Sequence, residues 1–491
     1  MKRAPLLFAC VFVVVWLAVG PSVRGDSRQR GAGTRPNILL ITVDDLNWDS
    51  LGVTGSPVRD VSPNVDRLAH EGIRFTKAHV TVAICQPSRN VLMTGRYPQN
   101  AGALGFEDIA PDVPTIVEAL AHAGYYTGLM AKTGHVVPSR AAAWNEIVLA
   151  KQLKNGRGPQ LYLEHTRAFL ARAREANRPF FLMLNSQDPH RPFAGSQQEE
   201  NFKARDATTT EPQYGGGFPD VEHAYSPADV NVPPFLPDLP AVRQEIAQYY
   251  TSVRRADETT GAALRALDES GLRDRTLVIW LSDNGAALPF AKANAWLDST
   301  RTPLIVRWPH VVKAATLDDR HLLGGVDIGP TILEAAGLPN LKGAEGRSFL
   351  PLLQGKSQSG RDYVFTQIDQ VSSGASYPMR AVTDARYGYI FNAWPDGKTE
   401  MRVESMQGLT FPAMRAAAAT DPAAAARVKH FVYRTKEELY DYANDPHALH
   451  NLLDDGQHEA LAAKYRTILL RHMKDSADPQ LGAFEKFLAT L

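Results

Sequence analysis

The chain has 491 residues, of which 44% are hydrophobic and 22% are charged, and its 53 basic residues balance 53 acidic ones. This is the composition of a globular protein, long enough for two or more domains with buried cores. Because the charges balance, the net charge gives no reason to expect that the protein binds nucleic acid or an anionic membrane. A local basic pocket is still compatible with this balance.

The N-terminus has the pattern of a secretory signal peptide. Lys2 and Arg3 precede an apolar run over residues 6–19, which small and polar residues follow. The run is short for a transmembrane helix, so we expect a cleaved signal peptide over residues 1–25 and no membrane attachment after cleavage. An uncleaved anchor and lipidation at Cys10 are the alternatives. We expect a periplasmic or secreted protein of bacterial type, because the chain has no Asn-x-Ser/Thr sequon.

Strands and helices are predicted to alternate along the following part of the chain. Continuous apolar runs predict strands buried on both faces, at residues 37–43, 125–130, 179–185 and 276–281. Helical periodicity with a glycine just after it predicts helices at residues 63–71, 114–123 and 241–270. This alternation favours an α/β fold with a largely parallel sheet.

Each of the four predicted strands runs directly into polar residues. In parallel sheets, ligands bind outside the carboxyl ends of the strands, so these polar groups are expected to share one rim. The alternative for each group alone is a turn former, a helix cap or a solvated loop residue. The groups, in strand order, are Asp44 with Asp45, Lys132 with His135, His190, and Asp283 with Asn284.

The acidic part of this rim predicts a metal site. Asp44, Asp45, Asp283 and Asn284 offer only oxygen ligands, which select Ca²⁺, Mg²⁺ or Mn²⁺ rather than Zn²⁺. Cationic side chains are expected around the metal, and together they would form a receptor for a tetrahedral anion such as sulfate or phosphate. These cations are Arg89, Lys132, Lys292 and Arg301.

Cys85 would be the only thiol of the mature chain. Pro87 favours a helix start beside it, and a helix over residues 88–94 would end at Gly95. A helix N-terminus stabilises an anion, so Cys85 would meet the bound anion. A buried inert cysteine and a thiolate nucleophile assisted by His135 or His190 are the alternatives.

A second, smaller domain is predicted at the C-terminal end. Residues 339–354 read as the exit from the large domain and residues 355–360 as a polar linker. Beyond the linker we predict strands at 363–365, 387–391 and 401–403, and helices at 416–426 and 458–473.

Residues 85–96 carry a resemblance to a known family. Cys85-Gln86-Pro87-Ser88-Arg89, followed by Thr94-Gly95-Arg96, resembles the C-x-P-S-R-x-x-x-x-T-G-R motif of type I sulfatases, members of the alkaline phosphatase superfamily. The resemblance implies a catalytic α/β domain over residues 36–354, with helices on both faces of a mostly parallel sheet. It also implies a smaller α+β C-terminal domain over residues 361–491, with an antiparallel sheet that shapes the substrate pocket.

The resemblance also implies a mechanism. A formylglycine-generating enzyme would convert Cys85 to an aldehyde, whose hydrate would attack the sulfur of a sulfated glycan. The metal, Ca²⁺ rather than Mg²⁺, would be held by the two acidic pairs and by the modified Cys85. The implied roles of the remaining residues are stabilisation of the hydrate by Arg89, binding of sulfate oxygens by Lys132 and Lys292, proton removal by His135, and protonation of the leaving group by His190. Because Lys132 and His135 are three residues apart rather than two, Thr133 is a second candidate for the lysine position.

Within this family, several stretches resemble the heparan N-sulfatase branch. They are residues 188–191, 225–235, 277–284, 438–447 and, in the C-terminal part, Ser376-Tyr377-Pro378-Met379-Arg380. The resemblance implies hydrolysis of the N-sulfate of glucosamine in heparin or heparan sulfate, with Arg380 and Arg301 as substrate-binding residues. Arg380 could instead form a structural ion pair. Residues 367–374 depart from the histidine-rich stretch of that branch, so the exact sugar stays open.

Three other functions are compatible with the same residues. An O-sulfatase acting on a related sugar would use the same rim. So would a phosphonate or phosphodiester hydrolase, since the superfamily shares the metal site. The third alternative, a sulfoglycan-binding protein without catalysis, is disfavoured by the intact Cys85 motif, both acidic pairs and both histidines.

Overall fold

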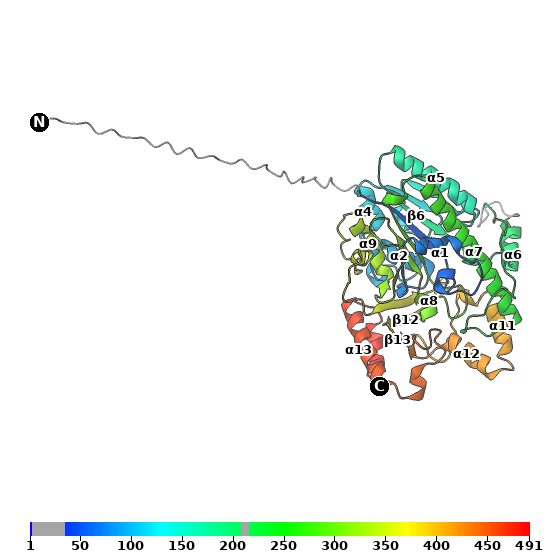
Figure 1. Ribbon diagram of the computed structural model, residues 1–491. Helices are drawn as coiled ribbons and strands as arrows, with labels where there is room; N and C mark the ends of the chain where they lie inside the picture. Colours follow the sequence, from blue (N-terminus) through cyan, green and yellow to red (C-terminus); the bar gives the residue numbers. More distant parts are fainter. Residues whose placement is uncertain (2–34, 207, 209–215) are drawn as a thin grey trace. The chain divides into compact units, whose positions relative to one another are not determined.

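The computed structural model describes residues 35–206, 208 and 216–491, together with residue 1 (Figure 1). Residues 36–491 form one compact unit. Apart from its first residue, the predicted signal peptide lies outside the described residues, as does Cys10. Among the described helices, none combines the length and the apolar character needed to cross a membrane.

An eight-stranded sheet forms the centre of the large region. Its first five strands are parallel, whereas β8 runs antiparallel to both of its neighbours, β7 and β2. The four predicted strands are confirmed as β1, β4, β6 and β7. In spatial order, the strands are β5 (Glu146–Val148), β4 (Tyr126–Met130), β6 (Phe180–Ser186), β1 (Asn37–Val43), β7 (Thr276–Ser282), β8 (Leu304–Arg307), β2 (Ile73–Phe75) and β9 (Thr316–Asp318).

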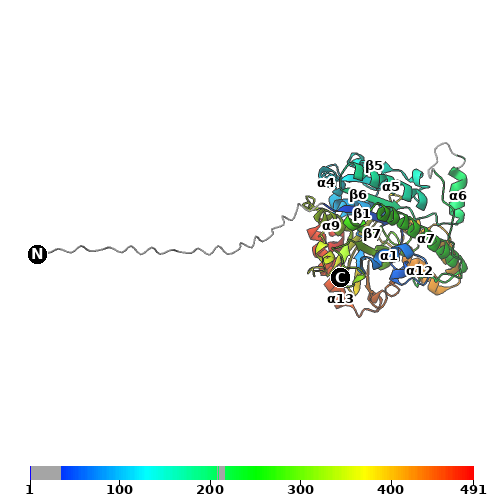
Figure 2. The same cartoon turned by 45° about the horizontal axis from the view of Figure 1, so that its top comes forward.

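Helices cover both faces of this sheet, which explains the unbroken apolar runs. In β1, Leu39 and Ile41 belong to one hydrophobic core, whereas Ile38 and Leu40 belong to another. Figures 1 and 2 show α5 and α7 on one side of β1 and β6, and α4 and α9 on the other. The helices of the first core include α1 (Pro63–His70), α5 (Pro159–Glu175) and α7 (Pro240–Glu269), and those of the second include α2 (Cys85–Thr94), α4 (Ile116–His122) and α9 (Ile328–Ala335).

The C-terminal part carries a separate four-stranded antiparallel sheet. Its side chains alternate: Tyr389 and Phe391 pack with α13 and α14, whereas Ile390 joins the core of the large region. Glu438 links the two parts, because it accepts a hydrogen bond of 2.8 Å from the indole of Trp296. The elements are β11 (Val364–Gln370), β12 (Ser376–Thr383), β13 (Tyr387–Asn392), β14 (Glu437–Asp441), α13 (Glu459–Asp475) and α14 (Leu481–Leu488).

Two predictions for the C-terminal part were wrong. Residues 401–403 are extended but form no strand in the described structure. The alanine-rich helix predicted over residues 416–426 is interrupted, because the Asp421 carboxylate accepts from the Ala423 N–H at 2.8 Å and starts a new helix there. The two helices are α11 (Thr410–Ala417) and α12 (Pro422–Tyr433).

The remaining elements are short or peripheral. β3 and β10 form a two-stranded parallel sheet. The bounds are β3 (Ala78–His79), β10 (Leu323–Gly324), α3 (Pro98–Ala101), α6 (Gln197–Asp206), α8 (Leu297–Thr300) and α10 (Leu350–Leu353).

Candidate active site

The acidic pairs meet where β1 and β7 end. These strands are parallel and in register, with Val43 opposite Ser282, so the residues that follow them emerge side by side. The backbone N–H of Asp45 donates to Oδ1 of Asp283 at 3.0 Å, which ties the two strand ends together. Asp45 has a left-handed backbone (φ 61°), a conformation that aspartate tolerates better than most residues. All four residues of the two acidic pairs are fully buried, and Cys85, the fifth predicted ligand, is 3% exposed.

Asn284 supplies a test of whether this site suits a cation. Its amide nitrogen donates to Oδ1 of Asp45 at 2.7 Å and to the Gly285 carbonyl at 2.8 Å. Its buried Oδ1 has no hydrogen-bond partner among the described residues. An unpartnered oxygen is costly in the interior, and beside three carboxylates it is a ready ligand for a positive ion. The donor set therefore fits a hard divalent cation.

Three cationic side chains, Arg89, Lys132 and Lys292, surround the carboxylates. Arg89, from α2, donates to both Asp44 and Asp283. Lys132 pairs with Asp44, so it is Lys132 that the structure brings to the rim at the lysine position. Burial opposes ionisation of Asp44, but the charges of Arg89 and Lys132 outweigh it and hold its pKa well below the usual range. These cations provide positive charge to an anionic ligand.

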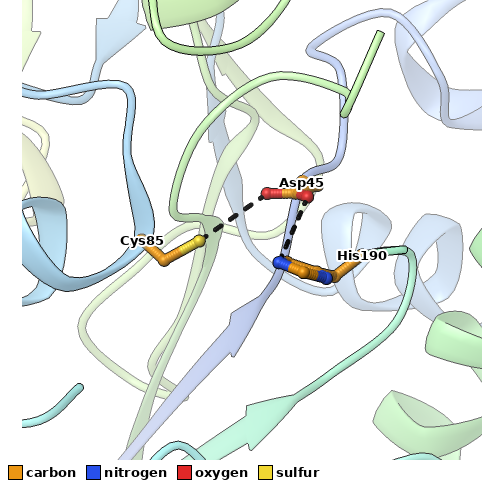
Figure 3. Close-up of side chains that lie close together, drawn as sticks. All are labelled: Asp45, Cys85 and His190. Atoms are coloured by element: carbon orange, nitrogen blue, oxygen red, sulfur yellow. Dashed lines mark hydrogen bonds and ion pairs between the residues drawn. The ribbon is translucent and has the colours of Figure 1, made fainter. Parts of the chain in front are cut away.

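Cys85 is the first residue of α2 and faces the metal ligands. Its Sγ lies 4.0 Å from Oδ1 of Asp45, and Figure 3 shows the Cys85 and His190 side chains both directed at that carboxylate. Burial raises the pKa of the Cys85 thiol well above its usual range. The thiol therefore stays protonated at neutral pH, which disfavours the thiolate nucleophile. The helix start predicted beside Pro87 is confirmed, and α2 ends at Gly95.

His190 is oriented by its own backbone neighbourhood. Its Nδ1 lies 2.5 Å from the Arg191 carbonyl oxygen, which can only accept, so Nδ1 carries the proton. Its Nε2 then points into the site, 3.2 Å from Oε1 of Glu404 and 3.8 Å from Oδ2 of Asp45. Two carboxylates around Nε2 favour a proton there, but burial outweighs them and lowers the pKa of His190 below its usual value.

Glu404 is a member of the site that the sequence analysis missed. It belongs to a short 3-10 helix of the C-terminal part, Glu404–Met406. Its Oε2 lies 2.9 Å from Nζ of Lys292, whose Nζ is also 2.8 Å from Oδ2 of Asp45. Burial opposes ionisation of Glu404, but the charges of Lys292 and His190 outweigh it and keep its pKa well below the usual range. No motif signals this residue, because only the fold brings it to the rim.

His135 lies on the other side of the cationic group. Its ring packs edge-on against Phe106, at 5.7 Å between centroids, and its Nδ1 has no hydrogen-bond partner among the described residues. Burial, and next the positive charge of Lys132, lower the pKa of His135 to about 2. A neutral imidazole in this position can accept a proton.

The two predicted substrate-binding residues, Arg301 and Arg380, make contacts away from the acidic rim. The Arg301 guanidinium stacks over Trp48, 3.9 Å from the ring centroid, and its Nε donates to the Thr76 carbonyl. Arg380 is buried and forms ion pairs with Asp369 at 2.7 Å and with Asp478 at 2.5 Å. The structure thus places Arg380 in the ion pair that was its alternative, and brings neither arginine into contact with the acidic rim.

Comparison with known proteins assigns a family to this arrangement. A family model described as "Sulfatase" matches residues 36–338, which include every residue of the rim except Glu404. The chain belongs to the sulfatase family. Enzymes of this family hydrolyse sulfate esters or sulfamates, generally with a formylglycine and a divalent metal, so the present sulfatase is a hydrolase of this class.

Two curated relatives extend over most of this sulfatase. Human N-sulphoglucosamine sulphohydrolase is 30% identical over 469 residues, which cover 91% of each chain. An ulvan-active sulfatase of Formosa agariphila is 26% identical over 478 residues, 90% of this chain and 76% of the relative. A second family model, "N-sulphoglucosamine sulphohydrolase, C-terminal", matches residues 288–396.

Solved structures confirm the alkaline phosphatase-like sulfatase fold. One, determined in complex with its substrate D-glucosamine-2-N,6-O-disulfate, superposes with a TM-score of 0.66 at 18% identity and covers 91% of this sulfatase and 99% of that chain. The phosphonate monoester hydrolase of Agrobacterium radiobacter gives a TM-score of 0.62 at 19% identity, covering 90% of this sulfatase and 96% of that chain. At such identities the likeness concerns the fold alone.

Proposed function

We propose that this sulfatase hydrolyses the N-sulfate of glucosamine in heparin- or heparan-sulfate-type glycans. The observation that carries the proposal is the 30% identity to human N-sulphoglucosamine sulphohydrolase, which extends over 91% of both chains. The C-terminal family model over residues 288–396 supports it, because that segment includes Lys292 and strand β12.

In this proposal Cys85 is converted to formylglycine, and Ca²⁺ is held by Asp44, Asp45, Asp283, Asn284 and the converted residue. The converted residue supplies a nucleophilic oxygen and the ion supplies positive charge beside it. Ca²⁺ suits the site because every donor from the two acidic pairs is an oxygen.

The chain's own cationic residues bind the sulfate group. Arg89 and Lys132 lie on the Asp44 side of Cys85, whereas Lys292 lies on the Asp45 side. Their side chains are buried, so their charges act on the sulfate oxygens with little screening by water. This arrangement stabilises the negative charge that spreads over those oxygens as the bond to the leaving group breaks.

Two histidines divide the proton transfers. His190 presents Nε2 beside Glu404 and would protonate the departing amine. His135, whose lowered pKa keeps it neutral, would accept a proton. One acid and one base with different environments match a displacement in which one group gains a proton and another loses one.

The proposal includes a sulfated glycan as substrate and a formylglycine-generating enzyme as maturation partner. It also places the mature protein in the periplasm or outside the cell, after removal of residues 1–25. The sequence motif at Cys85 and the N-terminal apolar run support these points.

A substrate panel tests the specificity. The matured enzyme is incubated with N-sulfated, 2-O-, 3-O- and 6-O-sulfated disaccharides, and free sulfate is measured by ion chromatography. We expect release from the N-sulfated sugar only. Release restricted to O-sulfated sugars would overturn the N-sulfate assignment and favour an O-sulfatase, which the ulvan-active relative at 26% identity makes the second candidate.

Glu404 gives a prediction about pH dependence. Burial lowers the pKa of His190 below its usual value, and the carboxylate of Glu404 only partly offsets this lowering. Glu404→Gln removes the raising charge, so the pKa of His190 falls and its proton is lost at lower pH. We expect the alkaline limb of the kcat/KM profile to move to lower pH and kcat/KM at neutral pH to fall by about tenfold to a hundredfold.

The matched control for this variant is Glu437→Gln. Glu437 also lies in the C-terminal part, but it binds Arg466 at 2.6 Å, away from the rim. Its substitution should leave the position of the alkaline limb unchanged. If the limb of Glu404→Gln coincides with that of the wild type, Glu404 does not act on His190.

A further inference from the structure

A cavity of about 570 Å³ adjoins the candidate active site at Glu404. Its walls come from the C-terminal part: the turn between β11 and β12 with the start of β12, the segment over residues 400–407, and α11. Glu404 belongs to both places, because its carboxylate reaches His190 and Lys292 while the residue lines the cavity. The volume lies within the roughly 300–1,000 Å³ of ligand pockets.

The segment before Glu404 is extended, and its side chains alternate. Met401 and Val403 are buried in the hydrophobic core, which turns Arg402 to the opposite side, that of the cavity and solvent. The Tyr377 hydroxyl fixes the backbone here: it accepts from the N–H of Arg402 at 3.1 Å and donates to the Glu400 carbonyl at 3.3 Å. The position of Arg402 beside the cavity is therefore built into the fold.

Two arginines at this cavity have no side-chain partner within the described part of the chain. Arg402 and Arg415 are both exposed, and neither guanidinium has a hydrogen-bond or ion-pair partner among the described residues. Arg380 shows the contrast, since it is buried and held by two carboxylates. Free guanidinium groups bind carboxylate and sulfate oxygens in a bidentate manner, which makes the cavity suited to an anionic group.

The cavity also offers partners for the rest of a sugar. Ser373 is exposed at its edge and can exchange hydrogen bonds with hydroxyl groups. Tyr377 and Phe411 contribute aromatic surface to the lining. Glu404 contacts Lys292 and His190 and also lines this cavity, so a glycan that continues from the sulfated sugar past Glu404 would enter this space.

We propose that this cavity binds the sugar next to the sulfated one, and that Arg402 and Arg415 recognise an acidic group on that neighbour. The proposal rests on the glycan substrate proposed above and narrows it to an acidic oligosaccharide rather than a free monosaccharide. Both a uronate carboxylate and an O-sulfate offer the required anion.

Four substrates and one double variant test this subsite. N-sulfoglucosamine is supplied as the monosaccharide, linked to glucose, and linked to a uronic acid with and without a 2-O-sulfate. In Arg402→Ala/Arg415→Ala we expect kcat/KM to fall about tenfold or more for the two acidic disaccharides. We expect no change for the monosaccharide or the neutral disaccharide. The 2-O-sulfated arm shows whether the carboxylate or the sulfate is the group recognised.

Arg386→Ala is the control, because Arg386 is exposed, lies outside the cavity and pairs with Asp441 at 2.7 Å. An equal fall in kcat/KM for all substrates, or no fall for any, would overturn the subsite.

A direct binding measurement separates this inference from the proposed activity. Calorimetry with Cys85→Ala protein and the desulfated glucosamine–uronate disaccharide should show binding that the additional double substitution abolishes, whether or not the wild type releases sulfate. Equal binding with and without the two arginines would contradict the proposal.

Discussion

Cys85→Ala should abolish sulfate release while leaving the fold intact. Replacement of a covalent nucleophile typically costs on the order of 10⁴-fold to 10⁶-fold in kcat, so we expect activity at or below the detection limit. The thiol makes one weak contact, at 4.0 Å to Asp45, so its loss should change the free energy of unfolding by only about 1 kcal/mol. Sulfate release and thermal unfolding are measured on the same preparation.

Mass spectrometry of the wild type accompanies this experiment. In the active protein, the peptide that contains Cys85 should have exchanged one sulfur and two hydrogens for one oxygen, as conversion of a thiol to an aldehyde requires. Full activity of a preparation in which Cys85 remains a thiol would contradict the formylglycine mechanism. Substantial activity of the alanine variant would show that the nucleophile is elsewhere.

Asp45→Asn should lose both the bound metal and most of the activity. Asp45 touches more of the site than any other ligand described above: its carboxylate reaches Asn284 at 2.7 Å, Lys292 at 2.8 Å and His190 at 3.8 Å. Removal of its charge takes away one of the carboxylates that neutralise Lys292, and it leaves the cation with fewer anionic ligands. A metal ion supplies several kcal/mol of transition-state stabilisation, so we expect kcat/KM to fall by about 10²-fold to 10⁴-fold.

The readout besides activity is the metal content after gel filtration, measured by elemental mass spectrometry. Asp257→Asn is the control: Asp257 is also a buried aspartate, but it accepts from the Val65 N–H at 2.8 Å at the start of α1. That variant should unfold at lower temperature and still retain metal. If Asp45→Asn retains a full equivalent of metal, Asp45 is not a ligand.

The rim could be predicted because parallel strands place distant residues together. Asp44 and Asp283 are far apart in sequence, yet each follows a buried apolar strand, and β1 and β7 are neighbours in register. The prediction needed only the strand positions and the rule that parallel strands end at one edge. Arg89 and Cys85 followed because a proline near a helix start and a glycine at its end bracket α2.

Contacts made by the C-terminal part could not be predicted in this way. Glu404 reaches Lys292 across 112 sequence positions from a segment without regular strand pairing, so no periodicity places it at the rim. The partners of Arg380 include Asp478, 98 positions away, and only the packed structure identifies them. The interruption of the alanine-rich helix was different, because Asp421-Pro422 is a recognisable helix start that the alanine run concealed.

The burial of α2 limits when Cys85 could be modified relative to folding. Every residue from Cys85 to Thr94 is buried, including Pro87 and Arg89 of the motif that a modifying enzyme would have to grip. An enzyme active site cannot close around a helix packed against a sheet, so in the proposed maturation Cys85 would have to be converted while this segment is still unfolded. Under that proposal modification would compete with folding, and a chain that folds first would remain an inactive thiol form. Slower folding or delayed translocation should raise the active fraction of a preparation, even though neither changes the folded structure.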